Sequence, residues 1–142
     1  MFAPRLPIAE HVNRLQCADL FLDTLPYNAH TTASDALWAG VPVLTCAGSA
    51  FVGRVAGSLL GAVGLPELVT HTLQDYEKLA MKLATDAGLL GELRKKLARN
   101  RCIEPLFDTD RFRRHMESAY RTMWETWQGG GQPRAFTVDP ID

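Results

Sequence analysis

Apolar and polar residues alternate along this chain with two different periods. Short apolar runs at 20–23 and 42–46 have the length and composition of buried strands, and a weaker run lies at 67–69. Strands separated by helices in the first half indicate an α/β layer with a parallel sheet. Apolar residues at helical spacing predict helices over 8–18, 32–39, 51–64, 72–85, 89–101 and from 109 to the glycines at 129–131.

The number of predicted strands is small for a complete α/β domain. Two strands are well defined and a third is weak, whereas a doubly wound domain has about six. The predicted fold class is therefore α/β, a partial Rossmann-like lobe whose second half is helical. We expect one lobe over residues 1–128 and a flexible tail over 129–142, where no periodicity remains.

Composition and charge exclude several classes of protein. The chain has 142 residues, enough for about one domain, and a net charge of -1 that gives no general attraction to nucleic acid or to an anionic membrane. It has neither a run of about 18 apolar residues nor a signal-peptide pattern, so a cytoplasmic location is expected. Three cysteines without a CxxC pair, Cys17, Cys46 and Cys102, argue against a disulfide framework or a zinc site.

The stretch "DTLPYNAHTTASDALWAGVPV", residues 23–43, places small polar residues between a predicted strand and a predicted helix. Ligands of parallel α/β sheets bind beyond the carboxyl ends of the strands. A helix N-terminus at that place offers unpaired backbone N–H groups and about half a unit of positive charge. His30, Thr31 and Thr32 add side-chain donors, so the pattern is suited to a phosphate or diphosphate.

A purely structural interpretation of the same residues is also open. Thr32 and Asp35 fit the Ser/Thr-x-x-Asp/Glu capping box, in which the cap alone contributes about 0.5–2 kcal/mol. His30 taken by itself is typical of a solvated loop histidine. The two interpretations can coexist, because a carboxylate at position 35 can also accept hydrogen bonds from ribose hydroxyls.

The segment "ADLFLDTLPYNAHTTASDALWAGVPVLT" resembles the carboxyl-terminal catalytic lobe of the O-linked N-acetylglucosamine transferases. The resemblance continues through "GRVAGSLLGAVGLPELV", "YEKLAMKLATD", "PLFDTDRF" and "YRTMWETW", and it covers about residues 4–128. It implies the two-lobed glycosyltransferase B fold. It also implies transfer of N-acetylglucosamine (GlcNAc) from uridine diphosphate (UDP)-GlcNAc to protein Ser or Thr hydroxyls, with inversion of the anomeric carbon and without a metal.

The resemblance also implies which residues bind the donor. The matching positions form a diphosphate group (His30, Thr31 and Thr32), a ribose group (Asp35) and a base group, in which His11 packs on the uridine, Arg14 reaches the uracil edge and the backbone near Leu6 meets the base. Some family members have a lysine where this chain has Ile8. An isoleucine cannot donate a hydrogen bond, so we expect Ile8 to pack instead and the nucleotide affinity to be lower.

Other parts of the family's catalytic region have no counterpart in this sequence. The resemblance implies an amino-terminal lobe, an upstream lysine on the donor phosphates, tetratricopeptide repeats and an acceptor protein as partners. No general base is assigned, and the predicted catalytic role is electrostatic stabilisation of the leaving diphosphate. We therefore expect no turnover without the other lobe. The alternative is a non-catalytic nucleotide-binding or protein-interaction module.

Two further features lie in the second half. The basic segment 92–101 suggests a nucleic-acid binder, but the apolar stripe of Leu93 and Leu97 favours a surface helix with solvated cations. The last helix carries a broad apolar stripe that core packing would explain. If it packs on a lobe that is absent, part of the stripe is exposed and promotes self-association.

Overall fold

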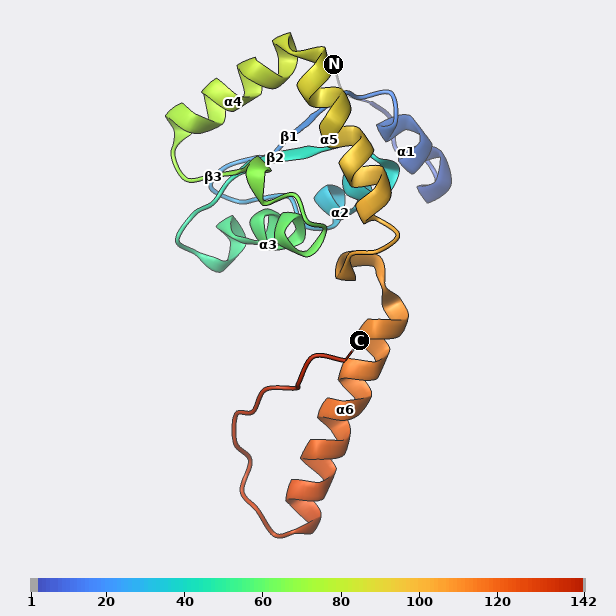
Figure 1. Ribbon diagram of the computed structural model, residues 1–142, viewed down its shortest axis with the longest axis vertical. Coiled ribbons are helices and arrows are strands. Elements are labelled where there is room, and N and C mark those ends of the chain that lie inside the picture. Colours follow the sequence, from blue (N-terminus) through green and yellow to red (C-terminus); the bar gives the residue numbers. More distant parts are fainter. Residues whose placement is uncertain (1–2, 142) are drawn as a thin grey trace.

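A three-stranded parallel sheet forms the centre of the computed structural model, which describes residues 3–141 (Figure 1). The strands are β1 (Phe21–Leu22), β2 (Val43–Cys46) and β3 (Val69–Thr70), in the order β1-β2-β3. Phe21 pairs with Val43, and Thr45 pairs with Val69. The predicted α/β class with a parallel sheet is confirmed, including the weak third strand. Residues 1, 2 and 142, the outer ends of the predicted lobe and tail, lie outside the described part.

Helices surround this sheet, and Figure 1 shows α4 and α5 on the opposite side of the strands from α2 and α3. Short 3-10 turns connect several elements. The helices are α1 (Ile8–Leu15), α2 (Thr31–Ala39), α3 (Val55–Ala62), α4 (Leu73–Thr85), α5 (Ala87–Asn100) and α6 (Thr109–Gln128), and the 3-10 turns are η1 (Phe51–Gly53), η2 (Pro66–Leu68) and η3 (Pro105–Phe107).

Several predicted boundaries differ from those of the structure for local reasons. The first helix ends at Leu15 because residues 16–18 continue in tight turns, for example with the Cys17 amide bonded to the Arg14 carbonyl. The predicted helix 51–64 is divided into η1 and α3. Gly53 is the last residue of η1, and it lies so close to the Gly48 backbone that a Cβ would meet the Gly48 Cα at 3.2 Å. The fifth helix begins earlier than predicted because Asp86 caps it.

The core lies where α2, α3 and α5 meet the sheet. Leu37, Val43, Leu60 and Leu97 are all fully buried, and each contributes about 1.5–3 kcal/mol relative to an exposed position. In α2 the small residues facing the core are alanines, which allow this helix to approach the sheet closely. The predicted C-cap is confirmed, because Gly40 has a left-handed φ of 86° and ends α2.

The ends of α3 and α5 are joined by a buried asparagine. Asn100 is 3% exposed, and its Nδ2 donates to the carbonyl oxygens of Val63 at 2.8 Å and Gly64 at 3.3 Å. Gly64 has a φ of 70°, and a Cβ there would lie 2.7 Å from the same Nδ2. The position therefore requires glycine both for its conformation and for the close approach.

The basic segment of α5 is a surface helix, as the apolar stripe predicts. Leu93 and Leu97 are buried, and Lys96 pairs with Glu67 at 2.6 Å. The prediction is wrong for Arg101, which is not a solvated cation. Its guanidinium donates to the Trp38 carbonyl oxygen and lies 5.9 Å from the centroid of the Trp38 ring.

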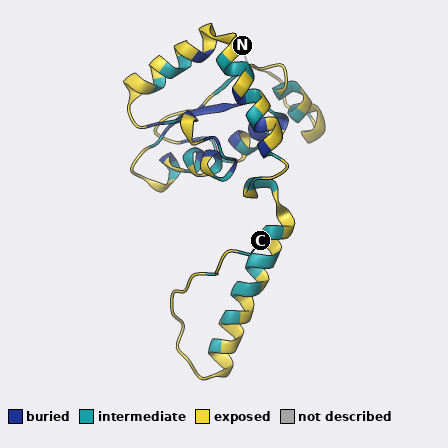
Figure 2. Ribbon diagram, in the orientation of Figure 1, coloured by how far each residue is buried: buried dark blue, intermediate teal, exposed yellow. Residues whose placement is uncertain are grey.

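Helix α6 is the longest helix of the described residues, and like the short α1 it has no buried residue (Figure 2). It leads away from the lobe, and its apolar residues face solvent. The expectation that part of the apolar stripe is exposed is confirmed, whereas self-association through it stays a prediction. We call this set the α6 stripe: Phe112, Tyr120, Met123, Trp124 and Trp127, which are 51% to 67% exposed.

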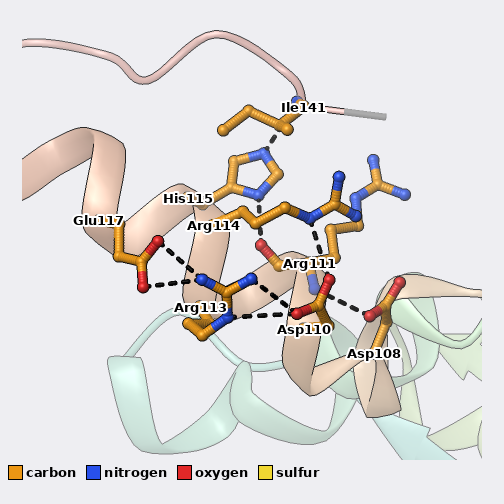
Figure 3. A network of polar contacts seen from close by, with 8 residues as sticks. All are labelled: Asp108, Asp110, Arg111, Arg113, Arg114, His115, Glu117 and Ile141. Atoms are coloured by element: carbon orange, nitrogen blue, oxygen red, sulfur yellow. Dashed lines mark hydrogen bonds and ion pairs between the residues drawn. The ribbon is translucent and has the colours of Figure 1, made fainter.

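Ion pairs stabilise the first turns of α6 (Figure 3). Asp108 caps the helix by accepting from the Arg111 amide at 2.8 Å. Arg113 bonds Asp110 at 2.8 Å and Glu117 at 2.7 Å. The hydrogen bond from Arg113 holds the pKa of Asp110 below its ordinary value. All these groups are solvent-exposed, so salt weakens their attraction.

Residues 132–141 form neither helix nor strand, and the chain returns to the first half of α6 (Figure 3). His115 Nδ1 donates to the Arg111 carbonyl oxygen at 2.8 Å, and its Nε2 accepts from the Ile141 amide at 3.2 Å. The flexibility of this tail stays a prediction. Within residues 3–141, no helix has the length and hydropathy to span a bilayer.

Candidate functional site

Helix α2 begins without a side-chain cap. His30 occupies the N-cap position and makes no capping bond with its side chain, and the first main-chain bond runs from the Ser34 amide to the His30 carbonyl. The amides of residues 31–33 precede the first intrahelical donor, so the helix supplies no acceptor for them. The predicted capping box is wrong. Because the helix starts at Thr31, Thr32 already has helical geometry and is not the cap residue.

Among the helices of the described residues, α4, α5 and α6 have side-chain caps, whereas α1 and α3, like α2, have none. Thr72 caps α4 through the Asp75 amide at 3.1 Å, and Asp86 caps α5 through the Leu89 amide at 2.9 Å. Asp108 caps α6 in the same way. Within residues 3–141 no side chain caps the N-terminus of α2, and residues 31 and 32 are exposed beside its first amides.

The imidazole of His30 is held between two aromatic rings. Tyr27 stacks on it with centroids 5.1 Å apart and planes at 20°, and Phe51 approaches edge-on at 6.2 Å. The Nε2 atom of His30 is buried and has no hydrogen-bond partner within residues 3–141. A buried polar atom without a partner costs about 1–3 kcal/mol, a cost that a bound acceptor or donor would remove.

The predicted base group lies on α1 and the segment before it. Arg14 donates to the Pro4 carbonyl at 2.8 Å, and its Nη2 lies 3.1 Å from His11 Nδ1. A guanidinium only donates, so His11 Nδ1 accepts and the His11 proton is on Nε2. The bond to Pro4 also folds residues 4–7, including Leu6, back toward α1.

Ile8 does not pack, contrary to the prediction. Its side chain is 82% exposed, because the neighbouring residues 7–10 all lie outside the core and leave the first turn of α1 in solvent. Only Val12 and Leu15 of this helix contact the core cluster. Ile8 therefore makes no packing contact with the core that could replace the hydrogen bond expected from the lysine of other family members.

The structure brings the diphosphate and ribose groups together on one helix. Asp35 lies one turn after Thr31, and residues four apart share a face of a helix. The base group lies on a different helix, α1, which packs beside α2. Among residues 3–141, no hydrogen bond connects His11 or Arg14 with the diphosphate group.

Sequence reasoning missed a set of buried polar residues at the carboxyl ends of the strands. Asp23 follows β1 and is 5% exposed, Thr45 lies in β2 and is fully buried, and Thr70 ends β3. Tyr76 of α4 donates to the Asp23 carbonyl at 2.9 Å. Burial, with the nearby Asp23 charge, raises the pKa of Tyr76 above its ordinary value. A polar residue directly after an apolar run was the available signal.

No metal site is built into this region. Within the described residues, no group of three His, Cys, Asp or Glu side chains lies close enough to hold a metal ion. The three cysteines are free thiols, with Cys46 buried and the other two exposed.

Comparison with known proteins gives consistent matches. Residues 1–116 match the model of glycosyl transferase family 41. The probable UDP-N-acetylglucosamine–peptide N-acetylglucosaminyltransferase SEC of Arabidopsis thaliana is 42% identical over 131 residues, which are 92% of this chain and 13% of that protein. The UDP-N-acetylglucosamine–peptide N-acetylglucosaminyltransferase of Caenorhabditis elegans is 42% identical over 121 residues, or 85% of this chain and 10% of that protein.

A solved structure agrees with these sequence matches. A mutant of the Thermobaculum terrenum O-GlcNAc transferase superimposes with a TM-score of 0.77 at 37% identity. The match covers 89% of this chain and 24% of that one, so this chain spans a small part of its relatives' length. Since the family model covers most of the sequence and the fold agrees, the chain belongs to glycosyl transferase family 41 and corresponds to a part of the O-GlcNAc transferase catalytic region.

Proposed function

We propose that this chain forms the donor-binding part of a protein O-GlcNAc transferase and binds UDP-GlcNAc. The diphosphate lies at the N-terminus of α2, with His30, Thr31 and Thr32 as donors. Asp35 accepts from the ribose hydroxyls. The uridine lies against His11, and Arg14 and the backbone near Leu6 contact the uracil.

The observation that carries this proposal is the uncapped, exposed start of α2. Its free amides and positive dipole end attract an anion, and two threonine hydroxyls stand beside them. The unpartnered Nε2 of His30 adds a third kind of polar atom to the same place. The names of the relatives, which are UDP-N-acetylglucosamine–peptide transferases, support UDP-GlcNAc as the donor.

In the reaction, the hydroxyl oxygen of an acceptor Ser or Thr attacks the anomeric carbon as the bond to the β-phosphate oxygen breaks. The configuration inverts and UDP leaves. The developing charge on the diphosphate is stabilised by the α2 amides and hydroxyls, without a metal. No general base is assigned in this chain, so the group that takes the proton of the acceptor hydroxyl lies outside it, and the amino-terminal lobe supplies much of the acceptor site. Transfer therefore requires that lobe.

Calorimetric titration with UDP tests the binding site. Each hydrogen bond to a charged group contributes about 1.5–3 kcal/mol, so the double substitution Thr31→Ala and Thr32→Ala should weaken UDP binding by on the order of 100-fold or more. Thr109→Ala is the matched control, because Thr109 is also the first residue of a helix but its helix is capped by Asp108. Equal UDP affinity in the double variant and the control would refute the site.

A transfer assay separates this proposal from a non-catalytic module. The chain alone should not glycosylate a Ser- or Thr-containing acceptor, and addition of a family amino-terminal lobe should restore transfer. If UDP binds but no lobe restores transfer, the nucleotide-binding or interaction module is the better assignment. The exposed α6 stripe is the observation that favours that second candidate.

A further inference from the structure

The carboxylate of Asp23 is the most fully bonded polar side chain near the proposed site. It lies directly after β1, is 5% exposed and accepts three hydrogen bonds. Oδ1 accepts from the amides of Thr24 at 2.8 Å and Ala29 at 2.6 Å, and Oδ2 accepts from Thr45 Oγ1 at 2.6 Å. With both oxygens engaged and water excluded, this group is unsuited to act as a general base.

Two of these bonds close the loop that leads into α2. The Thr24 and Ala29 amides lie at the two ends of the loop 24–29, and one carboxylate oxygen bonds both. Within the loop, Thr24 Oγ1 donates to the Tyr27 carbonyl, and Asn28 Nδ2 donates to the Thr24 carbonyl. Since Ala29 directly precedes His30, the carboxylate determines where the chain enters the helix.

The third bond connects this loop to the sheet. Thr45 is a fully buried residue of the central strand β2, so its hydroxyl is a fixed reference point. The Thr45 carbonyl in turn accepts from Thr70 Oγ1 of β3 at 2.9 Å. On the other side, Tyr76 of α4 donates to the main-chain carbonyl of Asp23. The loop is thus bonded directly to β2 and to α4, and through Thr45 it is connected to β3.

We propose that Asp23 is a positioning residue for the diphosphate end of the donor. It fixes the loop 24–29 and thereby places His30, Thr31 and Thr32 relative to the sheet. This inference rests on the proposed function, because it concerns the same anion site. A negative charge close to a diphosphate would by itself oppose binding, so the value of this side chain lies in its three accepted hydrogen bonds.

Substitutions at position 23 separate geometry from charge. Asp23→Ala removes both acceptor oxygens, and with them all three hydrogen bonds, and releases the loop. In Asp23→Asn, the amide oxygen keeps the Thr24 and Ala29 bonds, and the amide nitrogen donates to Thr45 Oγ1 after the hydroxyl rotates. Asp19→Ala is the matched control, because Asp19 is a carboxylate that lies 84% exposed in an ion pair with Arg94.

The test is a titration of each isotopically labelled variant with UDP and, separately, with uridine, followed by NMR chemical shifts. Asp23→Ala should weaken UDP binding at least tenfold and change uridine binding much less, because uridine contacts α1 and Asp35, one turn into α2, whereas the diphosphate contacts the residues that directly follow the loop. Asp23→Asn and Asp19→Ala should stay within about threefold of the wild type for both ligands. A global loss of structure would weaken both ligands equally, so the split between them is the diagnostic result.

Each outcome decides the inference. Equal UDP affinity in Asp23→Ala and the wild type, or an equal loss of UDP and uridine binding in a variant whose NMR spectrum shows a folded chain, overturns it while the proposed function stands. A wild-type chain that binds no UDP overturns the proposed function and the inference with it. If Asp23→Ala does not fold, Thr45→Val decides instead: a selective loss of UDP with rescue in Thr45→Ser supports the inference, and unchanged UDP affinity overturns it.

Discussion

Helix α5 of the α/β lobe and helix α6 are both amphipathic, but they lie in very different environments. In the lobe, the apolar faces of α2, α3 and α5 enclose the sheet, and residues such as Leu37 and Leu97 have no exposed surface. In α6, the apolar stripe has no buried residue at all. An amphipathic pattern therefore predicts which face of a helix is apolar. Whether that face is buried, and by which partner, depends on the rest of the assembly.

The largest expected effect compares one side chain from each region. Leu97→Ala should lower the free energy of unfolding by about 2–5 kcal/mol, because it leaves a cavity in the core. Met123→Ala removes a side chain of similar size from the exposed α6 stripe and should change it by less than about 0.5 kcal/mol. Urea unfolding followed by circular dichroism measures both. An equal decrease in the free energy of unfolding for the two variants would show that α6 unfolds cooperatively with the lobe.

The next effect concerns one tyrosine in each region. Tyr76→Phe removes the hydrogen bond to the Asp23 carbonyl and should cost about 0.5–1.5 kcal/mol at neutral pH. Tyr120→Phe, on the exposed stripe, is the matched control and should unfold like the wild type at neutral pH. Urea midpoints of the three proteins provide the comparison, and a control that loses as much as Tyr76→Phe would contradict it.

The stability difference between the wild type and Tyr76→Phe should depend on pH in a defined direction. Burial raises the pKa of Tyr76 above 10.0, so the neutral phenol is favoured in the folded state. The associated stability is fully present below the pKa of the unfolded state and is lost as pH rises through the folded pKa. The advantage of the wild type over Tyr76→Phe should therefore shrink above pH 10. An advantage that grows there would contradict the assignment.

The smallest effect is expected for the ion pairs of α6. Arg113 bonds Asp110 and Glu117 at the surface, where solvent and salt screen the charges. Arg113→Ala should leave the urea midpoint of the lobe indistinguishable from the wild type at about 0.15 M salt. A midpoint shift as large as that of Leu97→Ala would mean that the start of α6 supports the lobe.

Much of the fold could be predicted from the sequence because its periodic segments are long or strongly buried. The strand at 42–46, the helix of α4 and the C-cap at Gly40 follow directly from local patterns. Boundaries were less certain where non-local contacts decide them. The division between η1 and α3 depends on the approach of Gly53 to Gly48, which no local pattern reveals.

The candidate site also contains features that a local pattern predicts and features that depend on distant residues. His30, Thr31 and Thr32 are adjacent in sequence, so their position at a helix start was predictable, even though the capping box was not formed. The bonds of Asp23 to Ala29 and Thr45 join residues 6 and 22 positions apart, and only the folded chain brings them together. Similarly, Ile8 and Val12 are spaced to share one face of α1, but only the later turns of this helix reach the core. The exposure of Ile8 therefore could not be predicted from its spacing.

The bond from Asn100 to the end of α3 has a consequence for how the chain matures during synthesis. The carbonyls of residues 63 and 64 have to wait for a side chain that is made more than thirty residues later. Until then, a nascent polypeptide carries all three strands without α5, which covers part of one side of the sheet (Figure 1). Translation must therefore pass α5 before Leu93 and Leu97 can complete the core of the lobe.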